Sequence, residues 1–246
     1  HGAAATGRRK AKMENVSVLI HGDDFVATGS REDIKQFRQT IAGRFTVKDK
    51  IVGSRSDLGE LQETRVLNRI IRWTSNGWEY EADQRHAELI IEEMGVKESK
   101  GSDTPGVKEE AADSEGAVDE RELPRAESTA FRGIAARANY LGADRPDIQF
   151  AVKEICKKMS APKREDWSKL KRLAKYLVKH PRMVQQFRWQ APQGMIRIYS
   201  DSDWAGCKGT RKSTSGGAIM IGSHCVRTWS KSQATIALSS AEAELI

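Results

Sequence analysis

Two adjacent carboxylates, Asp23 and Asp24, lie between two short apolar runs near the start of the chain. The runs, residues 16–20 and 25–28, are rich in β-branched side chains, which favours two strands. Gly22 permits unusual backbone angles and aspartates favour turns, so the pattern predicts a hairpin with the acids at its tip. Gly-Asp is ordinary turn chemistry, and a purely structural turn is one interpretation. The other is a magnesium site, because Mg²⁺ takes one or two carboxylates together with substrate phosphates.

A second group of carboxylates stands near the end of the sequence. Asp201 and Asp203 end a predicted strand, and Glu244 lies on a helix predicted after two further strands. Acids on a strand end and on the next helix could hold two divalent ions, which clamp the attacking and leaving oxygens of a phosphoryl displacement. A calcium loop is the alternative for an Asp-x-Asp pattern, but its twelfth position is Lys212 instead of the required Glu.

Local patterns predict the elements that position the first group. Ser30, with Asp33 three residues later, resembles a capping box, and Gly43 is a stop signal for a helix over 30–45. Asn76-Gly77 between two β-rich runs predicts a hairpin within 65–83. Apolar side chains at helical spacing predict a further helix over 84–96.

The second half of the chain is predicted to be helical and then a meander. Helices are expected over 128–143, 146–160 and 163–180, with Pro146 at the start of the second. A β-β-β-α order follows over 194–246. Between the two halves, residues 97–126 are acidic and rich in Gly and Ser, which predicts a flexible linker or a surface loop.

The composition favours a polyanionic partner. The 246 residues carry 41 Lys and Arg against 34 Asp and Glu, a formal net charge of +7. The three cysteines are far apart and match no metal-binding spacing, which favours a reducing compartment. The sequence has no signal-peptide core and no apolar run long enough to span a membrane, so no membrane association is expected.

The helix predicted over 163–180 has one apolar face and one basic face. Trp167, Leu170, Ala174 and Leu177 share the apolar side, and the remaining surface carries Lys171, Lys175 and Lys179 among other basic residues. Such a charge pattern is usually a solvated helix face. The alternative is a surface that contacts nucleic-acid phosphates.

Several motifs together resemble the Pol polyproteins of copia-type retrotransposons. The ribonuclease H region of that family is matched by D-S-D-W-A-G, R-K-S-T-S-G, W-S-K-S-Q and A-L-S-S-A-E-A-E within residues 199–245. The segment Y-L-G-A-D-R-P-D-I matches the family upstream of these motifs, and L-I-H-G-D-D-F-V falls where its reverse transcriptase carries the Asp-Asp hairpin.

The resemblance implies a fold class and a division into parts. It implies an α+β chain with a reverse-transcriptase palm and the start of the thumb over 1–96, the linker over 97–126, a helical thumb or connection region over 127–192, and a truncated ribonuclease H-like unit over 193–246. It also implies that Mg²⁺ or Mn²⁺ is bound by the catalytic residues, which are Asp23, Asp24, Asp201 and Glu244. Asp203 is a weaker match. His21 and Gly22 depart from the Tyr-Val that precedes the acids in many members, although Gly-Asp-Asp occurs in other template-directed polymerases.

The function implied is RNA-directed DNA synthesis with ribonuclease H activity in the parent polyprotein. The implied partners are an RNA or DNA primer–template, an RNA–DNA hybrid and the remainder of the Pol polyprotein, within the cell in a cytoplasmic virus-like particle or in the nucleus. The family's palm needs a further upstream Asp and its ribonuclease H two further downstream acids, so this sequence is expected to be a fragment that is inactive alone. The alternative is a degenerate, non-catalytic retroelement product that at most binds nucleic acid.

Overall fold

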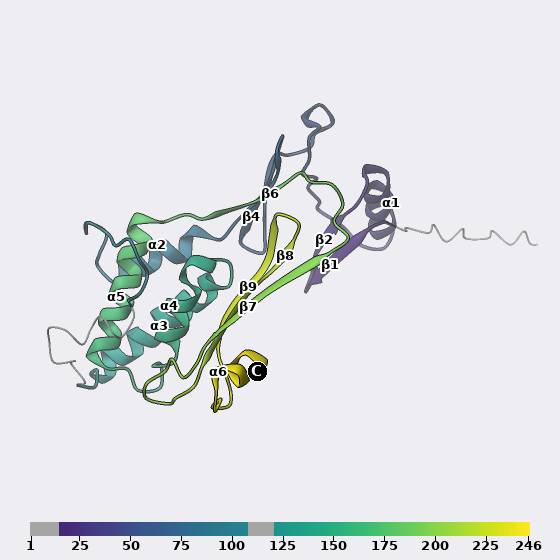
Figure 1. Ribbon diagram of the computed structural model, residues 1–246. Helices are drawn as coiled ribbons and strands as arrows, with labels where there is room; N and C mark the ends of the chain where they lie inside the picture. Colours follow the sequence, from purple (N-terminus) through teal and green to yellow (C-terminus); the bar gives the residue numbers. More distant parts are fainter. Residues whose placement is uncertain (1–14, 108–120) are drawn as a thin grey trace, which may run out of the picture.

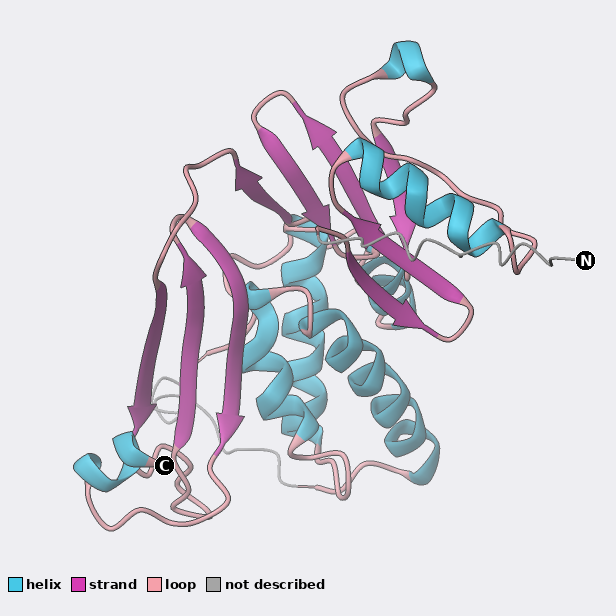
Figure 2. Ribbon diagram, turned by 90° about the vertical axis from the view of Figure 1, so that its right-hand side faces the viewer, coloured by secondary structure: helices cyan, strands magenta, loops and turns pink. Residues whose placement is uncertain are grey.

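The computed structural model describes residues 15–107 and 121–246. Within these ranges the protein is a mixed α+β structure, as predicted, with antiparallel sheets of two, four and three strands. Figure 1 shows most helices gathered at one side of the molecule and the N-terminal hairpin at the other, with the three-stranded sheet between them. Figure 2 shows the same helices alongside that sheet.

Strands β1 (Ser17–His21) and β2 (Asp24–Thr28) form the predicted N-terminal hairpin. Helix α1 (Arg31–Ala42) follows it and is capped as predicted, because the Ser30 hydroxyl accepts a hydrogen bond from the Asp33 backbone N–H at 3.2 Å. Gly43 ends this helix. The part of the first predicted domain at residues 1–14 lies outside the described residues.

The four-stranded sheet joins two distant parts of the chain. Strands β3 (Glu63–Val66), β4 (Arg69–Thr74) and β5 (Gly77–Glu81) form a meander after a short 3₁₀ turn, η1 (Ser56–Leu58), and the β4–β5 hairpin confirms the prediction from Asn76-Gly77. Strand β6 (Val184–Arg188) then pairs with β5 from far along the chain, with Phe187 opposite Trp78. The sequence did not predict β6, because its short run, V-Q-Q-F-R, has no clear alternation of its own.

Four helices pack around the main hydrophobic core: α2 (Gln84–Glu93), α3 (Arg125–Gly142), α4 (Gln149–Cys156) and α5 (Arg164–Lys179). The predicted apolar face of α5 is confirmed, since Leu170, Ala174 and Leu177 are fully buried and Trp167 packs against the core. The other large buried side chains come from α2, α3 and α4, and they include Ile90, Phe131, Ile134 and Ile155.

The predicted helix over 146–160 is wrong at both ends. Pro146 opens a short 3₁₀ turn, η3 (Pro146–Ile148), and α4 ends at Cys156. The reason lies in Arg145, whose buried guanidinium donates to both carboxylate oxygens of Asp147, at 2.9 and 2.7 Å, and to the backbone oxygen of His180 at 3.0 Å. The tight turn at Pro146 keeps Asp147 within reach of Arg145, so this ion pair fixes the end of α5 to the start of α4.

The described ends of the predicted linker are packed against α5 and its N-terminal loop. The backbone N–H of Ser102 donates to the Lys175 carbonyl at 3.1 Å, and Asp103 forms an ion pair with Lys179. At the other end, Leu123 is buried and α3 already begins at Arg125. These parts are therefore held against the bundle, and residues 108–120 lie outside the described residues.

The final part of the chain has the predicted β-β-β-α order. Strands β7 (Ile196–Asp203), β8 (Thr214–Ile221) and β9 (His224–Ser232) form an antiparallel meander, and α6 (Ser240–Leu245) follows. Ser239 caps α6 by accepting from the Glu242 backbone N–H at 3.1 Å. None of the helices in the described ranges has the length and apolar character needed to span a bilayer.

A buried carboxylate, Glu81, stands where the sheet meets the helices. It accepts hydrogen bonds from Arg182 at 2.7 and 2.9 Å and from Arg72 at 2.8 Å, and it also contacts Gln84 at the start of α2. Only 1% of its surface is exposed. The hydrogen bond from Arg182 is the largest cause that lowers the pKa of Glu81, to about 2, and it outweighs the opposing effect of burial.

The folded state should therefore lose stability in acid through Glu81. Its pKa of about 2 lies below its ordinary value of 4.5, so its contribution is complete above about pH 5 and disappears as the pH falls toward 2. We expect Glu81→Gln to lower the free energy of unfolding at pH 7 by about 2 kcal/mol, somewhat less than for a fully enclosed pair because Arg182 is half exposed.

Urea unfolding between pH 3 and pH 7 measures this effect. The variant should show a weaker pH dependence than the parent, and Glu88→Gln, at an exposed position of α2, should match the parent. A Glu81→Gln variant that keeps the parental pH dependence would assign the acid sensitivity to other groups.

Candidate functional site

The first pair of predicted site residues lies at the exposed tip of the N-terminal hairpin. His21 and Asp24 are paired across the two strands, which leaves Gly22 and Asp23 as the two-residue turn. Gly22 has a φ of 59°, a value that favours glycine at the first position of such turns. Asp23 and Asp24 are both exposed. The hairpin thus presents two neighbouring carboxylates to solvent, as the sequence predicted.

The strands behind these acids are unusually apolar for their exposure. Leu19, Ile20 and Phe25 are 57%, 62% and 47% exposed. An isolated two-stranded hairpin is at best marginally stable, and exposed apolar side chains of this size usually mark a contact surface. The hairpin therefore has the surface of a sheet that packs against further structure.

At the other predicted site, α6 brings Glu244 to strand β7. The Glu244 Oε1 atom accepts hydrogen bonds from the backbone N–H of Ser202 at 3.1 Å and from the Ser202 hydroxyl at 2.8 Å. Ser202 is the residue after Asp201, so Glu244 of α6 contacts the strand one position from Asp201, although no contact joins the two carboxylates in the part of the chain that the structure describes. Since side chains alternate along a strand, Asp201 and Asp203 project to the face opposite Ser202.

Asp203 has a structural role that its sequence neighbours did not reveal. Its Oδ1 atom accepts from the Thr214 backbone N–H at the start of β8. Its carboxylate also lies so close to Gly206 that a Cβ at that position would collide with it. Asp203 therefore closes the β7–β8 connection, which accounts for its place in the D-S-D-W-A-G motif.

Gln233 and Ser213 position α6 and the β7–β8 connection, and the sequence analysis did not single them out. The buried Gln233 side chain donates to the Ala243 carbonyl in α6 at 2.6 Å and to the Ser215 hydroxyl in β8 at 2.9 Å. The buried Ser213 hydroxyl accepts from the Ala205 backbone N–H at 2.9 Å. Gln233 belongs to the W-S-K-S-Q motif and Ser213 to the R-K-S-T-S-G motif. Membership in these motifs is the sequence feature from which their importance could have been predicted.

A buried lysine connects this unit to the helical bundle. Lys153 of α4 donates to the Thr214 hydroxyl at 2.7 Å and pairs with Glu154 at 2.5 Å. Burial is the largest influence on the pKa of Lys153 and lowers it, although the pairing with Glu154 opposes the effect. Since Thr214 is also bound by Asp203, Lys153 ties α4 to the loop that Asp203 closes.

The acids provide a partial rather than a complete metal-binding set. In residues 15–107 and 121–246, no three His, Cys, Asp or Glu side chains are grouped as a metal site would require. Two exposed carboxylates at the hairpin tip match the one or two that Mg²⁺ takes from a protein when phosphates and water supply its other ligands. Asp23 and Asp24 are of this residue type, whereas the contact of Glu244 is with Ser202 and not with Asp201.

The predicted basic face of α5 is partly covered. Lys171 is exposed, but Lys179 pairs with Asp103, and Arg172 donates to the Thr104 hydroxyl at 2.7 Å. Lys175 is half-buried, and its carbonyl accepts from Ser102. The surface that remains open for phosphates is thus narrower than the helical pattern implied.

Comparison with known proteins finds relatives along the whole chain. The chain is 28% identical over 227 residues to an uncharacterized mitochondrial protein, AtMg00810, of Arabidopsis thaliana. This alignment covers 92% of the chain and 88% of that protein. It is 37% identical over 116 residues to the retrovirus-related Pol polyprotein from transposon RE1 of the same plant. This alignment covers 47% of the chain and 8% of the polyprotein. It is 24% identical over 250 residues to the Pol polyprotein from transposon TNT 1-94 of Nicotiana tabacum. This alignment covers 97% of the chain and 17% of the polyprotein.

No family model and no solved structure matches the chain. The chain spans less than a fifth of the length of either Pol polyprotein, whereas it spans most of the mitochondrial protein. The motifs around Asp23, Arg145 and Asp201 keep the order that the family resemblance predicted, and a Pol relative aligns across nearly the whole chain. The chain is therefore a relative of the Pol polyproteins of copia-type retrotransposons and aligns with parts of them.

Proposed function

We propose that this part of the polyprotein carries the Asp-Asp hairpin of a reverse transcriptase and the first two carboxylates of a ribonuclease H. The parent polyprotein would synthesise DNA on an RNA or DNA primer–template and cleave the RNA strand of the resulting hybrid, in a cytoplasmic particle or the nucleus. The remainder of the polyprotein would complete both sites. Both reactions are phosphoryl transfers that two divalent ions can promote.

The observation that carries the proposal is the contact between Ser202 and Glu244. It brings an acid from α6 to the residue that follows Asp201, across a separation of 42 residues in sequence. A helix used only for packing would not need to direct a carboxylate at the exposed edge of β7. The polymerase half rests on Asp23 and Asp24, which are consecutive exposed acids at the tip of the hairpin.

The chain's own residues would bind and orient the reacting groups. Asp23 and Asp24 would hold Mg²⁺ or Mn²⁺ at the hairpin, and Asp201 and Glu244 would hold it at the second site. The ion would lower the negative charge of the phosphate and make an attacking oxygen more reactive. The hydrogen bonds from Ser202 keep the Glu244 carboxylate in one orientation, so less reorganisation is needed when the ion and the substrate bind.

A non-catalytic product that binds nucleic acid is the second candidate. The mitochondrial relative favours it, because the chain matches 88% of that protein, which is therefore far shorter than a Pol polyprotein. The two candidates differ in what the carboxylates must do. In the first they are required for catalysis, and in the second they could be replaced without loss of binding.

Replacing Asp23 tests the polymerase half. In a chain extended upstream to the full palm, Asp23→Asn should reduce primer extension by roughly 100-fold or more, on the scale of losing one positioned charge-stabilising group. Asp24→Asn should also impair extension. Asp57→Asn, an exposed aspartate paired with Arg55, is the matched control and should extend at the parental rate. Parental extension by both hairpin variants would reduce the pair to a structural turn.

Replacing Glu244 tests the ribonuclease H half in a chain extended downstream. The amide oxygen of Glu244→Gln can still accept from Ser202, so the melting temperature should stay near the parental value while hybrid cleavage falls roughly 100-fold or more. Asp201→Asn should behave in the same way. Asp203→Asn should instead mainly lower the melting temperature, because Asp203 closes the β7–β8 connection. Unchanged cleavage by the first two variants would refute the assignment.

Salt dependence tests the binding of the duplex. Affinity for a primer–template should fall steeply between low and physiological salt, because bound phosphates release counterions. Replacing Lys171, Lys175 and Lys179 together by Ala should weaken binding and reduce the slope of log affinity against log salt by up to about three. Replacing Lys35, Lys48 and Lys50, which are exposed near α1, removes the same charge elsewhere. Equal effects of the two triple variants would show that only net charge matters.

A further inference from the structure

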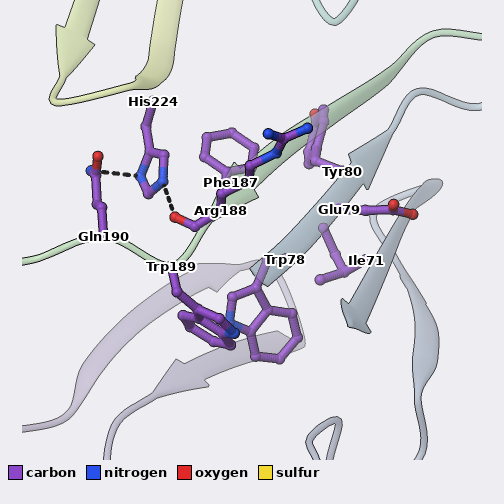
Figure 3. A pocket seen from close by; sticks show the side chains of 9 residues that line it. All are labelled: Ile71, Trp78, Glu79, Tyr80, Phe187, Arg188, Trp189, Gln190 and His224. Carbon is purple, nitrogen blue, oxygen red and sulfur yellow. Dashed lines mark hydrogen bonds between the residues drawn. The ribbon is translucent and has the colours of Figure 1, made fainter. Parts of the chain in front are cut away.

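An aromatic pocket lies where β5 and β6 meet the start of β9, and its lining includes none of the four predicted catalytic acids. Its volume is about 400 Å³, within the range of small-molecule sites. Most of its lining is aromatic and consists of the side chains of Trp78, Tyr80, Phe187, Trp189 and His224. Polar contacts come from Glu79, Arg188 and Gln190. Figure 3 shows these side chains around the space between β5, β6 and the turn that precedes β9.

The pairing of β5 with β6 places the rings on one face of the four-stranded sheet. Phe187 lies directly opposite Trp78, and Tyr80 is two residues farther along the same side of β5. His224 at the start of β9 closes the pocket from above in Figure 3, and its ring meets Phe187 edge-on at 5.4 Å between centroids. The pocket therefore depends on three segments that are distant in sequence.

Hydrogen bonds fix the polar edges of these rings. The Trp189 indole N–H donates to the Ser75 carbonyl at 2.9 Å, and its backbone N–H donates to Asn76 at 2.9 Å. His224 uses both ring nitrogens, with Nε2 at 2.6 Å from the Arg188 carbonyl oxygen and Nδ1 at 3.2 Å from the Gln190 side chain. Trp189 nevertheless remains 57% exposed. Its edge is thus tied to the protein while much of the ring stays open to a ligand.

Charge around the pocket favours an anionic chain. Exposed Arg188 lines the pocket, and a second hollow of about 240 Å³ continues from Tyr80 and Phe187 toward exposed Arg227 of β9. The acids nearby are partly neutralised, because Arg69 pairs with Asp144 at 2.8 Å and Arg72 lies 3.8 Å from Glu79. The two hollows share Tyr80 and Phe187 and have an arginine at each, so they provide ring surfaces for bases and cations for the linking phosphates.

We infer that this pocket binds an unpaired base of a single-stranded nucleic acid. Bases that are not paired stack on aromatic side chains and on guanidinium groups, and the contact tolerates any base because every base has a flat face. A duplex keeps its bases stacked inside and cannot insert one into a pocket of this size. This inference rests on the proposed function only in that the protein works on nucleic acid, and it requires neither acid site.

The test compares oligonucleotides that differ only in their bases. The whole chain is titrated with a fluorescein-labelled oligothymidylate and with an abasic strand of the same length, and binding is followed by anisotropy and by tryptophan emission. The parent should bind the base-bearing strand roughly 5- to 100-fold more tightly, on the scale of one base–aromatic stack, and only that strand should quench tryptophan. Equal affinity for the two strands overturns the inference without any variant.

Two tryptophan variants then locate the effect. Trp189→Ala should remove the preference for the base-bearing strand and leave binding to the abasic strand and to a duplex unchanged, while Trp189→Phe should keep most of the preference. Trp204→Ala is the matched control, because Trp204 is 50% exposed and also donates its indole N–H to a backbone carbonyl, at 3.1 Å, outside the pocket. A preference that survives in folded Trp189→Ala, or that disappears in Trp204→Ala as well, contradicts the inference.

These results are separate from those that test the proposed function. Primer extension and hybrid cleavage depend on the carboxylates, whereas the preference for bases depends on the rings. Loss of catalysis in the Asp23 and Glu244 variants together with equal binding of both strands would leave the proposed function intact and reject the pocket. The opposite pattern would keep the pocket and reject the catalytic assignment.

Discussion

The buried carboxylate of Glu81 is the contact on which the arrangement of the chain depends most. It ends β5, contacts Gln84 at the start of α2, and binds Arg72 of β4 and Arg182 of the segment that leads from α5 into β6. A buried charge is costly unless it is paired, so the contact with Arg182 favours a fold in which the chain returns to this position beyond α5 in sequence. Once it does, β6 lies beside β5 and the chain is directed toward β7. The sheet, the bundle and the final meander are thereby linked through one anion.

A second group of paired charges connects the loop after α3 to the four-stranded sheet and to the end of α5. Asp144 accepts from Arg69 of β4 and from Tyr80 of β5, and one residue later Arg145 binds Asp147 and the carbonyls at the end of α5. Burial is the largest cause that raises the pKa of Tyr80, and the bond to Asp144 adds to it, so the phenol stays protonated as a donor. The adjacent residues Asp144 and Arg145 of the Y-L-G-A-D-R-P-D-I segment therefore bind the sheet on one side and the helices on the other. These contacts give the short loop a structural role.

The sequence predicted the locally determined features well. The hairpin at Gly22, the cap at Ser30, the β4–β5 turn and the order of the last four elements all follow from residues a few positions apart, and the structure confirms them. It could not predict β6, the 3₁₀ turn at Pro146 or the packing of residues 101–104 on α5, because these depend on Glu81, Arg145 and Lys179 meeting partners far along the chain. The aromatic pocket was missed for the same reason, since no local pattern relates Trp78 to Trp189 or His224. The carboxylates were selected by motif, and their spatial arrangement needed the fold.

In the triplet Asp201-Ser202-Asp203, two residues make structural contacts and one keeps a side chain that could bind a metal ion. Asp203 is committed to the Thr214 backbone and Gly206, and Ser202 is committed to Glu244, so neither is available as an independent ligand. Asp201 keeps an exposed side chain, while the two residues that follow it are held by Glu244 and by Thr214. Rigidity of this kind is what a metal-binding carboxylate requires, because a charge that is already oriented needs little reorganisation when the ion and the phosphate arrive. The proposed role of Asp201 therefore follows from the constraints on the two residues after it as much as from its own chemistry.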